Sequence, residues 1–141
     1  MYTVKQVAQL TGLSAHTVRF YDDNNLIQGV VRNAANQRLF TDEAVEWLYM
    51  CKVMRRAGLT LKEIKIYGEL YSAGDETIPQ RMEIIRRRYE NAKKELEHIK
   101  IRMEALETKL HHYENLLQGK PDIWTYDFVI NSMEKEKRSA E

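Results

Sequence analysis

A short polar segment near the N-terminus carries the side chains with the clearest chemistry. It brings together the hydroxyls of Ser14 and Thr17, the imidazole of His16 and the guanidinium of Arg19. A guanidinium donates hydrogen bonds in a planar fork that matches a phosphate or the edge of a guanine, and the other groups add single hydrogen bonds. This chemistry suits recognition of a nucleic acid rather than catalysis.

Two further segments add groups of the same kind. A polar loop from Gly29 to Gln37 contains arginine and asparagine, and a second arginine follows it directly. A threonine and a lysine stand at the start of a later predicted helix, where free backbone amides attract phosphate. The candidate DNA-contacting residues are therefore Ser14, Ala15, His16, Thr17, Arg19, Tyr21, Arg32, Asn36, Arg38, Thr60 and Lys62.

Local signals place the first segment on the second of two short helices. Thr3 and Gln6 have the spacing of a capping box, and Gly12 ends the helix that they begin. Ser14 is a favourable N-cap for a second helix that runs to Tyr21. Two short helices joined by a glycine-containing turn predict a helix-turn-helix, whose second helix enters the major groove. Taken alone, such a pair also occurs in helical domains that bind no DNA.

The following residues predict a wing and two more helices. Leu26-Ile27 and Arg38-Leu39-Phe40 are short apolar segments on either side of the polar loop, which is a strand–loop–strand pattern. An arginine-bearing loop beside a recognition helix suits phosphate contact, although many surface loops are simply polar. Thr41 begins a third helix, and Thr60 with Glu63 forms a second capping box that begins a fourth.

Residues 76–118 predict one long helix with an apolar seam. Apolar residues recur at alternating steps of four and three over more than five heptads, which is typical of a coiled coil. A helical hairpin or a bundle would also cover this stripe, but no second comparable helix follows, so we expect a homodimer. The seam consists of Ile78, Met82, Ile85, Tyr89, Ala92, Leu96, Ile99, Met103, Leu106, Leu110, Tyr113 and Leu117.

Composition restricts the class of protein. The 141 residues allow one compact domain and an appendage, and the net charge of +1 gives no general sign of nucleic-acid binding. The single cysteine excludes an internal disulfide, and the N-terminus lacks the pattern of a signal peptide, so we expect a cytoplasmic protein without membrane spans. No glycine-rich phosphate loop, metal-ligand set or nucleophile–base pair is present, so we expect neither an enzyme nor a cofactor or metal.

The tail and the cysteine are candidates for sensing a signal. The segment after Pro121 is dense in apolar side chains, including Trp124, Tyr126 and Phe128, and such a group is expected to pack on the head or the dimer interface, or to line an effector pocket. Cys51, on the third helix, is either a small buried hydrophobic residue or a reactive thiol.

The order of these motifs resembles the MerR family of bacterial transcription regulators. The resemblance rests on VKQVAQLTGLSAHTVRFYDDNNLI, QRLFTDEAVEWL and MRRAGLTLKEIK at matching spacing. It implies a major-groove recognition helix with Arg19 and Tyr21, a wing that contains Arg38, and antiparallel pairing of the long helix. It also implies a pseudo-palindromic promoter operator that the dimer bends and untwists, so that RNA polymerase engages both promoter elements.

The chain departs from the family pattern at several positions. Phe20 and Phe40 stand where tyrosine is usual, and Asn25 replaces a usual glycine. Gly29 stands where proline is frequent, so we expect a more mobile wing. The cysteine pairs of the family's metal sensors are missing, and Val53 occupies the cysteine position of its aldehyde- and thiol-stress branch, two residues after Cys51.

The sequence therefore predicts a mostly helical chain with three parts. These are a winged helix-turn-helix head at 1–74, an antiparallel dimerisation coiled coil at 75–118 and a tail at 119–141. We favour a homodimeric transcription regulator that binds promoter DNA and responds to a small molecule or a stress signal. An effector-independent architectural or excisionase-like DNA-binding protein and a coiled-coil module whose head binds protein are the alternatives.

Overall fold

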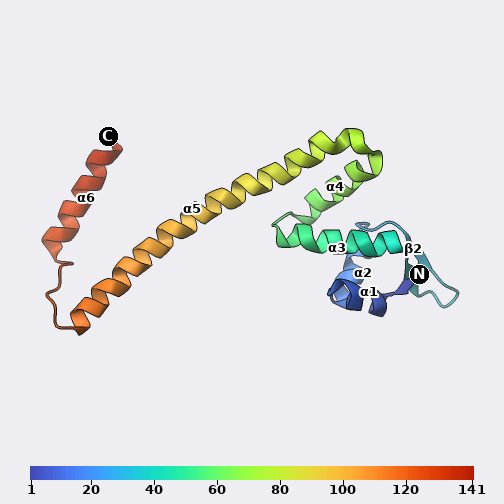
Figure 1. Ribbon diagram of the computed structural model, residues 1–141, viewed down its shortest axis with the longest axis horizontal. Helices are drawn as coiled ribbons and strands as arrows, with labels where there is room; N and C mark the ends of the chain where they lie inside the picture. The colour runs from blue at the N-terminus through green and yellow to red at the C-terminus, as the bar shows by residue number, and fades with distance from the viewer. The chain divides into compact units, whose positions relative to one another are not determined.

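The two helices of the predicted helix-turn-helix begin at the expected residues, and the second ends two residues beyond Tyr21. In the computed structural model, which describes residues 1–141, α1 spans Val4–Thr11 and α2 spans Ala15–Asp23 (Figure 1). The Thr3 hydroxyl accepts from the backbone amide of Gln6, and the Gln6 side chain accepts from the Thr3 amide, so the capping box is confirmed. The Ser14 hydroxyl accepts from the amide of Thr17 at 3.0 Å, which confirms the second cap. These local hydrogen bonds fix the start of the recognition helix.

The wing forms a small sheet whose first strand differs from the prediction. Strand β2 spans Val30–Arg32 and pairs antiparallel with β3, Arg38–Phe40, which also pairs with β1, Tyr2–Thr3. The prediction that Leu26-Ile27 form a strand is wrong, because β2 begins only at Val30; both side chains are instead buried in the core of the head. A short apolar pair in the sequence indicates that its side chains are buried, but it does not distinguish a strand from an irregular segment.

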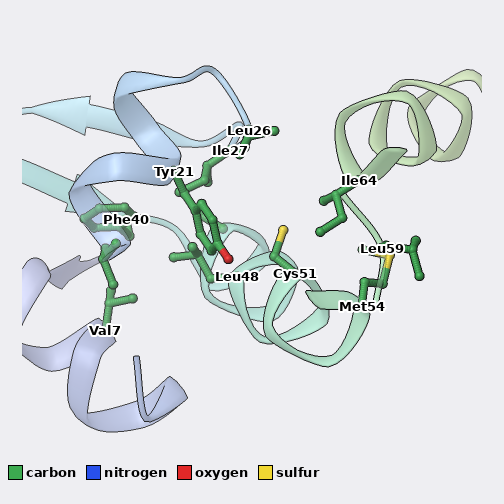
Figure 2. Packing of buried hydrophobic residues seen from close by; sticks show 12 residues of the cluster. Val7, Tyr21, Leu26, Ile27, Phe40, Leu48, Cys51, Met54, Leu59 and Ile64 are labelled. Atoms are coloured by element: carbon green, nitrogen blue, oxygen red, sulfur yellow. The ribbon is translucent and has the colours of Figure 1, made fainter. Parts of the chain in front are cut away.

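The core of the head lies between the helix pair, β3 and two further helices. Helix α3 spans Asp42–Arg56 and α4 spans Leu61–Ala73, each capped by the threonine predicted for it. Phe40, Leu48 and Ile64 are almost fully buried and link the sheet, α3 and α4 (Figure 2). Every buried side-chain nitrogen or oxygen has a hydrogen-bond partner. The core therefore holds the recognition helix and the wing on one support.

The long helix α5 spans Ile78–Leu117 and follows a 3-10 turn, η1, at Asp75–Thr77. Its first turns contact α4: the Arg81 guanidinium lies 5.2 Å from the centre of the Tyr71 ring, and Arg88 Nε donates to Glu63 Oε2 at 2.8 Å. The chain divides into two compact units at 1–92 and 93–141. The first unit thus includes the beginning of α5.

The second unit contains the rest of α5 and a helix that we did not predict. Helix α6 spans Tyr126–Ala140 and begins at Thr125, whose hydroxyl accepts from the amide of Phe128. The connecting segment turns back on α5. Two contacts show this: His112 Nε2 lies 3.3 Å from Asp122 Oδ1, and the His112 ring centre lies 5.6 Å from the Trp124 ring centre. His112 is buried at this contact. The tail therefore packs on the end of its own long helix. No helix has the length and apolar character needed to cross a membrane.

Gly29 has a backbone conformation that the wing depends on. Its φ is +78°, and a Cβ at this position would clash with the Thr41 hydroxyl. The Gly29 carbonyl also accepts from the amide of Thr41 at 3.1 Å. The family departure at this position therefore gives a turn whose backbone conformation and close contact with Thr41 suit glycine.

We expect Gly29→Ala to lower the free energy of unfolding by about 2–3 kcal/mol, because backbone strain and a steric clash combine there. Gly58→Ala is the matched control, since Gly58 has a φ of +94° and nothing near its would-be Cβ. That change should cost only about 1 kcal/mol. Urea unfolding at one protein concentration measures both, and equal losses would contradict the role of the Thr41 contact.

Candidate nucleic-acid interface

A polar groove lies between α1, the recognition helix α2 and the wing. Its volume is about 640 Å³. Residues from all three elements line it: Thr3, Val4, Lys5, Ala8, Gln9, Ala15, Arg19, Arg32, Asn36, Gln37 and Arg38. The structure thus brings together five of the residues predicted to contact DNA, namely Ala15, Arg19, Arg32, Asn36 and Arg38.

The groove has a strong bias of charge. Its lining contains one lysine and three arginines but no carboxylate. Arg19 is exposed and forms no hydrogen bond or ion pair within the chain, so all its donors face solvent. A cluster of cations of this kind raises the local concentration of a polyanion and contacts its phosphates directly. The near-neutral total charge of the protein hides this local concentration.

Arg38 has a different position from the one that its sequence pattern suggested. We expected it to contact phosphate from the wing, but its Nε donates to Asp22 Oδ2 at 2.7 Å and its Nη2 donates to Asp23. The Asp22 hydrogen bond is the main cause that raises the pKa of Arg38 above its ordinary value. The side chain is only 15% exposed. Arg38 is thus a positioning residue that ties the wing to the end of the recognition helix.

The wing tip is held by hydrogen bonds within its own turn. Arg32 Nη1 donates to the Asn36 carbonyl at 2.9 Å, and the backbone amide of Gln37 donates to Asn33 Oδ1 at 2.9 Å. Asn36 has a φ of +58°, a conformation that asparagine tolerates better than most residues. One donor of Arg32 thus holds the loop, and Arg32 stays a candidate for phosphate contact.

The N-terminus of α2 carries the remaining predicted side chains of the recognition helix. The Ser14 and Thr17 hydroxyls lie 2.8 Å apart and hydrogen-bond to each other. His16 is exposed beside them. None of the three lines the groove, so they stay candidates for base or phosphate contact at the helix end.

Tyr21 does not lie where we expected. It is 5% exposed and lies within the core, with its ring beside Leu48 (Figure 2). Burial is the main cause that raises the pKa of its phenol. Helical geometry explains the error, because Val18 and Tyr21 are three residues apart and share the inward face of α2. Tyr21 therefore supports the recognition helix and does not face DNA.

The start of α4 forms a separate polar site. Thr60 caps the helix, and Lys62 is exposed in its first turn, but neither lines the groove. Glu63 accepts from the Thr60 amide and from Arg88 of α5. The Arg88 hydrogen bond is the main cause that lowers the pKa of Glu63. A phosphate contact by Thr60 or Lys62 would thus occur at a helix end that α5 holds in place.

Sequence reasoning missed the contribution of α1. Lys5 and Gln9 line the groove, one helical turn apart on the polar face of that helix. The spacing was visible in the sequence, since Val4, Val7 and Ala8 mark the opposite face. The spacing could not show that the wing lies beside the polar face of α1, which carries Lys5 and Gln9.

Comparison with known proteins identifies the family. Residues 2–69 match the model for MerR HTH family regulatory proteins. An uncharacterized HTH-type transcriptional regulator of Haemophilus influenzae is 34% identical over 113 residues, covering 80% of this chain and 84% of that protein. The chain belongs to the MerR family. It is thus a DNA-binding transcriptional regulator and not an enzyme.

A MerR regulator of known structure shares most of the fold. The crystal structure of HiNmlR, a MerR family regulator lacking the sensor domain and bound to promoter DNA, is 33% identical with a TM-score of 0.66, and the match covers 84% of this chain and 91% of that one. A second match, a MerR family regulator from Bacillus thuringiensis, is 25% identical with a TM-score of 0.61 and covers 78% and 96% of the two chains.

Sensing groups are sparse in this MerR chain. No three histidine, cysteine or acidic side chains are grouped to hold a metal ion. Cys51 is fully buried, and burial raises the pKa of its thiol to about 12. Trp124 and Phe128 lie edge to face, with ring centres 5.5 Å apart, while Tyr126 is 79% exposed. Cys51 therefore acts as a core residue, contrary to the thiol-sensor alternative.

We expect Cys51 of the native protein to resist alkylation at pH 8, because a pKa of about 12 leaves about one thiolate in ten thousand. Iodoacetamide should modify it at the rate of an ordinary thiol only after unfolding in urea. Mass spectrometry at timed intervals measures both rates. Native labelling as fast as that of the unfolded chain would restore the redox hypothesis.

Proposed function

We propose that this MerR regulator binds a pseudo-palindromic promoter operator as a homodimer and distorts the DNA. The observation that carries the proposal is the groove in which the unpaired Arg19 lies beside Lys5 and Arg32 without any carboxylate in the lining. The relative HiNmlR, described as bound to promoter DNA, supports promoter DNA as the target. Because this target is bacterial chromosomal DNA, the proposal places the protein in the cytoplasm.

The long helix supports a dimer. Its seam side chains are large and apolar, yet Met82, Leu96 and Leu106 are 52%, 52% and 65% exposed in the single chain. A 40-residue helix is about 60 Å long, so the stripe is too large to remain in water on a stable monomer. A second copy covers it with the same surface, and the family resemblance favours antiparallel pairing. A two-fold dimer presents two recognition helices, which explains a pseudo-palindromic operator.

The wing supports distortion of the operator. Bending a promoter-sized site costs on the order of several kcal/mol, which backbone contacts must offset. Arg38 holds the wing to Asp22 of the recognition helix, so phosphate contacts from Arg32 and base contacts from α2 act as one rigid surface. A rigid surface with a fixed spacing requires the DNA to adapt. Such an adapted promoter then presents both of its elements to RNA polymerase.

A signal is part of the proposal, as a small molecule or a stress. Transcription in vitro from the operator promoter, with and without candidate ligands, separates this regulator from an effector-independent architectural protein. The proposed binding of promoter DNA does not depend on whether such a signal exists.

We expect Arg19→Ala to weaken binding to the promoter about 10- to 100-fold, because a bidentate arginine contact contributes on the order of 1–3 kcal/mol. Lys94→Ala, which removes the same charge from an exposed site on α5, is the control and should have little effect. Fluorescence anisotropy with labelled promoter fragments at two salt concentrations measures both. Unchanged specific affinity of the Arg19 variant would refute the assignment of α2.

We expect Leu106→Asp to convert the dimer to a monomer, because it places a charge in the middle of the seam. Ile101→Asp is the matched control, since Ile101 is 63% exposed on α5 but lies outside the seam. Sedimentation equilibrium measures the mass of each variant. If both variants, or neither, dissociate, the seam is not the dimer interface.

A further inference from the structure

A second pocket lies in the head, distinct from the DNA groove. It has a volume of about 500 Å³ and lies where the segment after α2, the start of α3 and one face of α4 meet. We call it the junction pocket, defined by Leu26, Thr41, Trp47, Gly68 and Tyr71 with a polar rim. This volume is within the usual range for pockets that bind small organic molecules. None of its lining residues takes part in the DNA groove.

The rings of Trp47 and Tyr71 form one wall of the junction pocket, and Tyr67 packs on Trp47 from outside the lining. The Trp47 ring stacks with those of Tyr67 and Tyr71, with ring centres 6.3 Å apart in each case. Trp47 Nε1 donates to the Leu26 carbonyl at 2.6 Å, which fixes the plane of the indole. A Cβ at Gly68 would lie 2.8 Å from Trp47 Cζ2, so the absence of a side chain there makes room for the ring. The wall is thus preorganised, which lowers the entropic cost of binding a ligand.

The rim of the pocket is polar and mostly acidic. Glu43 of α3 and Glu69 of α4 line it, and Lys65 carries the only positive charge in the lining. Aromatic faces attract cations through their quadrupole, and carboxylates at the rim add to this attraction. The pocket therefore favours a flat organic molecule that carries a positive charge.

The surroundings of the pocket connect the wing to the dimerisation helix. Gly29 and Thr41 line it, and their backbone hydrogen bond closes the base of the wing. On the other side, Tyr71 lines the pocket and contacts Arg81 of α5. A molecule in the pocket would thus contact Gly29 and Thr41 at the base of the wing, and Tyr71, which packs against α5.

We propose that the junction pocket binds a planar aromatic cation. The binding of this ligand does not depend on the proposed function. Its regulatory role, which is to change the position of the wing or of the long helix, rests on the proposed function. The DNA-binding head would then hold a sensory site of its own.

The test uses the full-length protein, free of DNA, and 1-methylquinolinium chloride as the probe. Two probes of similar two-ring shape, neutral quinoline at pH 8 and 2-naphthalenesulfonate, serve as comparisons. Calorimetry should show one saturable site per chain that binds the cation more tightly than the other two. In a Trp124→Phe background, where Trp47 is the only tryptophan, saturation should also quench its fluorescence.

A variant that lacks the rim carboxylates tests whether these charges, rather than the general surface charge, attract the cation. Glu43→Gln combined with Glu69→Gln should weaken binding of the cation about tenfold and leave quinoline binding unchanged. The matched control, Glu46→Gln with Glu76→Gln, removes two exposed carboxylates outside the pocket and should have no effect. Circular dichroism confirms that both variants are folded.

Three binding results would overturn the proposal, and so would one quenching result. They are equal binding of cation and anion, an equal loss in the control variant, or no saturable binding of the cation. Failure of acrylamide to quench Trp47 would also overturn it, because a second copy of the chain would then cover the pocket. Promoter binding by the unliganded protein is measured separately, so the two proposals fail independently.

Discussion

The ion pairs between Arg38 and the two aspartates at the end of α2 are the contact on which the DNA-binding surface depends. They join a wing strand to a recognition helix across a gap of sixteen positions in the sequence. The core holds α1, α2 and the wing together, and these ion pairs add a direct polar link between the wing and the end of α2. The pairs also offset part of the negative charge that Asp22 and Asp23 place at the end of α2. One arginine therefore joins the wing to the recognition helix and balances one of the two negative charges there.

The apolar seam of α5 places the second constraint on the molecule. Hydrophobic side chains that are half exposed in one chain must be covered, and a repeat over 40 residues is covered best by an identical helix. In the proposed dimer, symmetry would follow from packing of the seam rather than from any feature of the head. The spacing of its two recognition helices would then depend on how the two seams meet.

Elements set by local chemistry could be predicted from the sequence, and elements set by distant contacts could not. The caps at Thr3, Ser14 and Thr60 depend on groups within three residues, so their patterns sufficed. The strand assigned to Leu26-Ile27 and the outward position assigned to Tyr21 were wrong, because burial there depends on α3 and β3 packing over them. The family resemblance supplied the architecture, but not the partner of Arg38 or the aromatic wall around Trp47.

Glu63 belongs to two structures at once, the cap of α4 and the hydrogen bonds to Arg88 of the next helix. Together with the contact between Arg81 and Tyr71, this makes the first turns of α5 part of the head. A gene fusion or natural recombination that exchanged the DNA-binding head at the end of α4 would break both contacts. The segment that can be exchanged between relatives without such damage ends near Ala92, where the head's own packing ends.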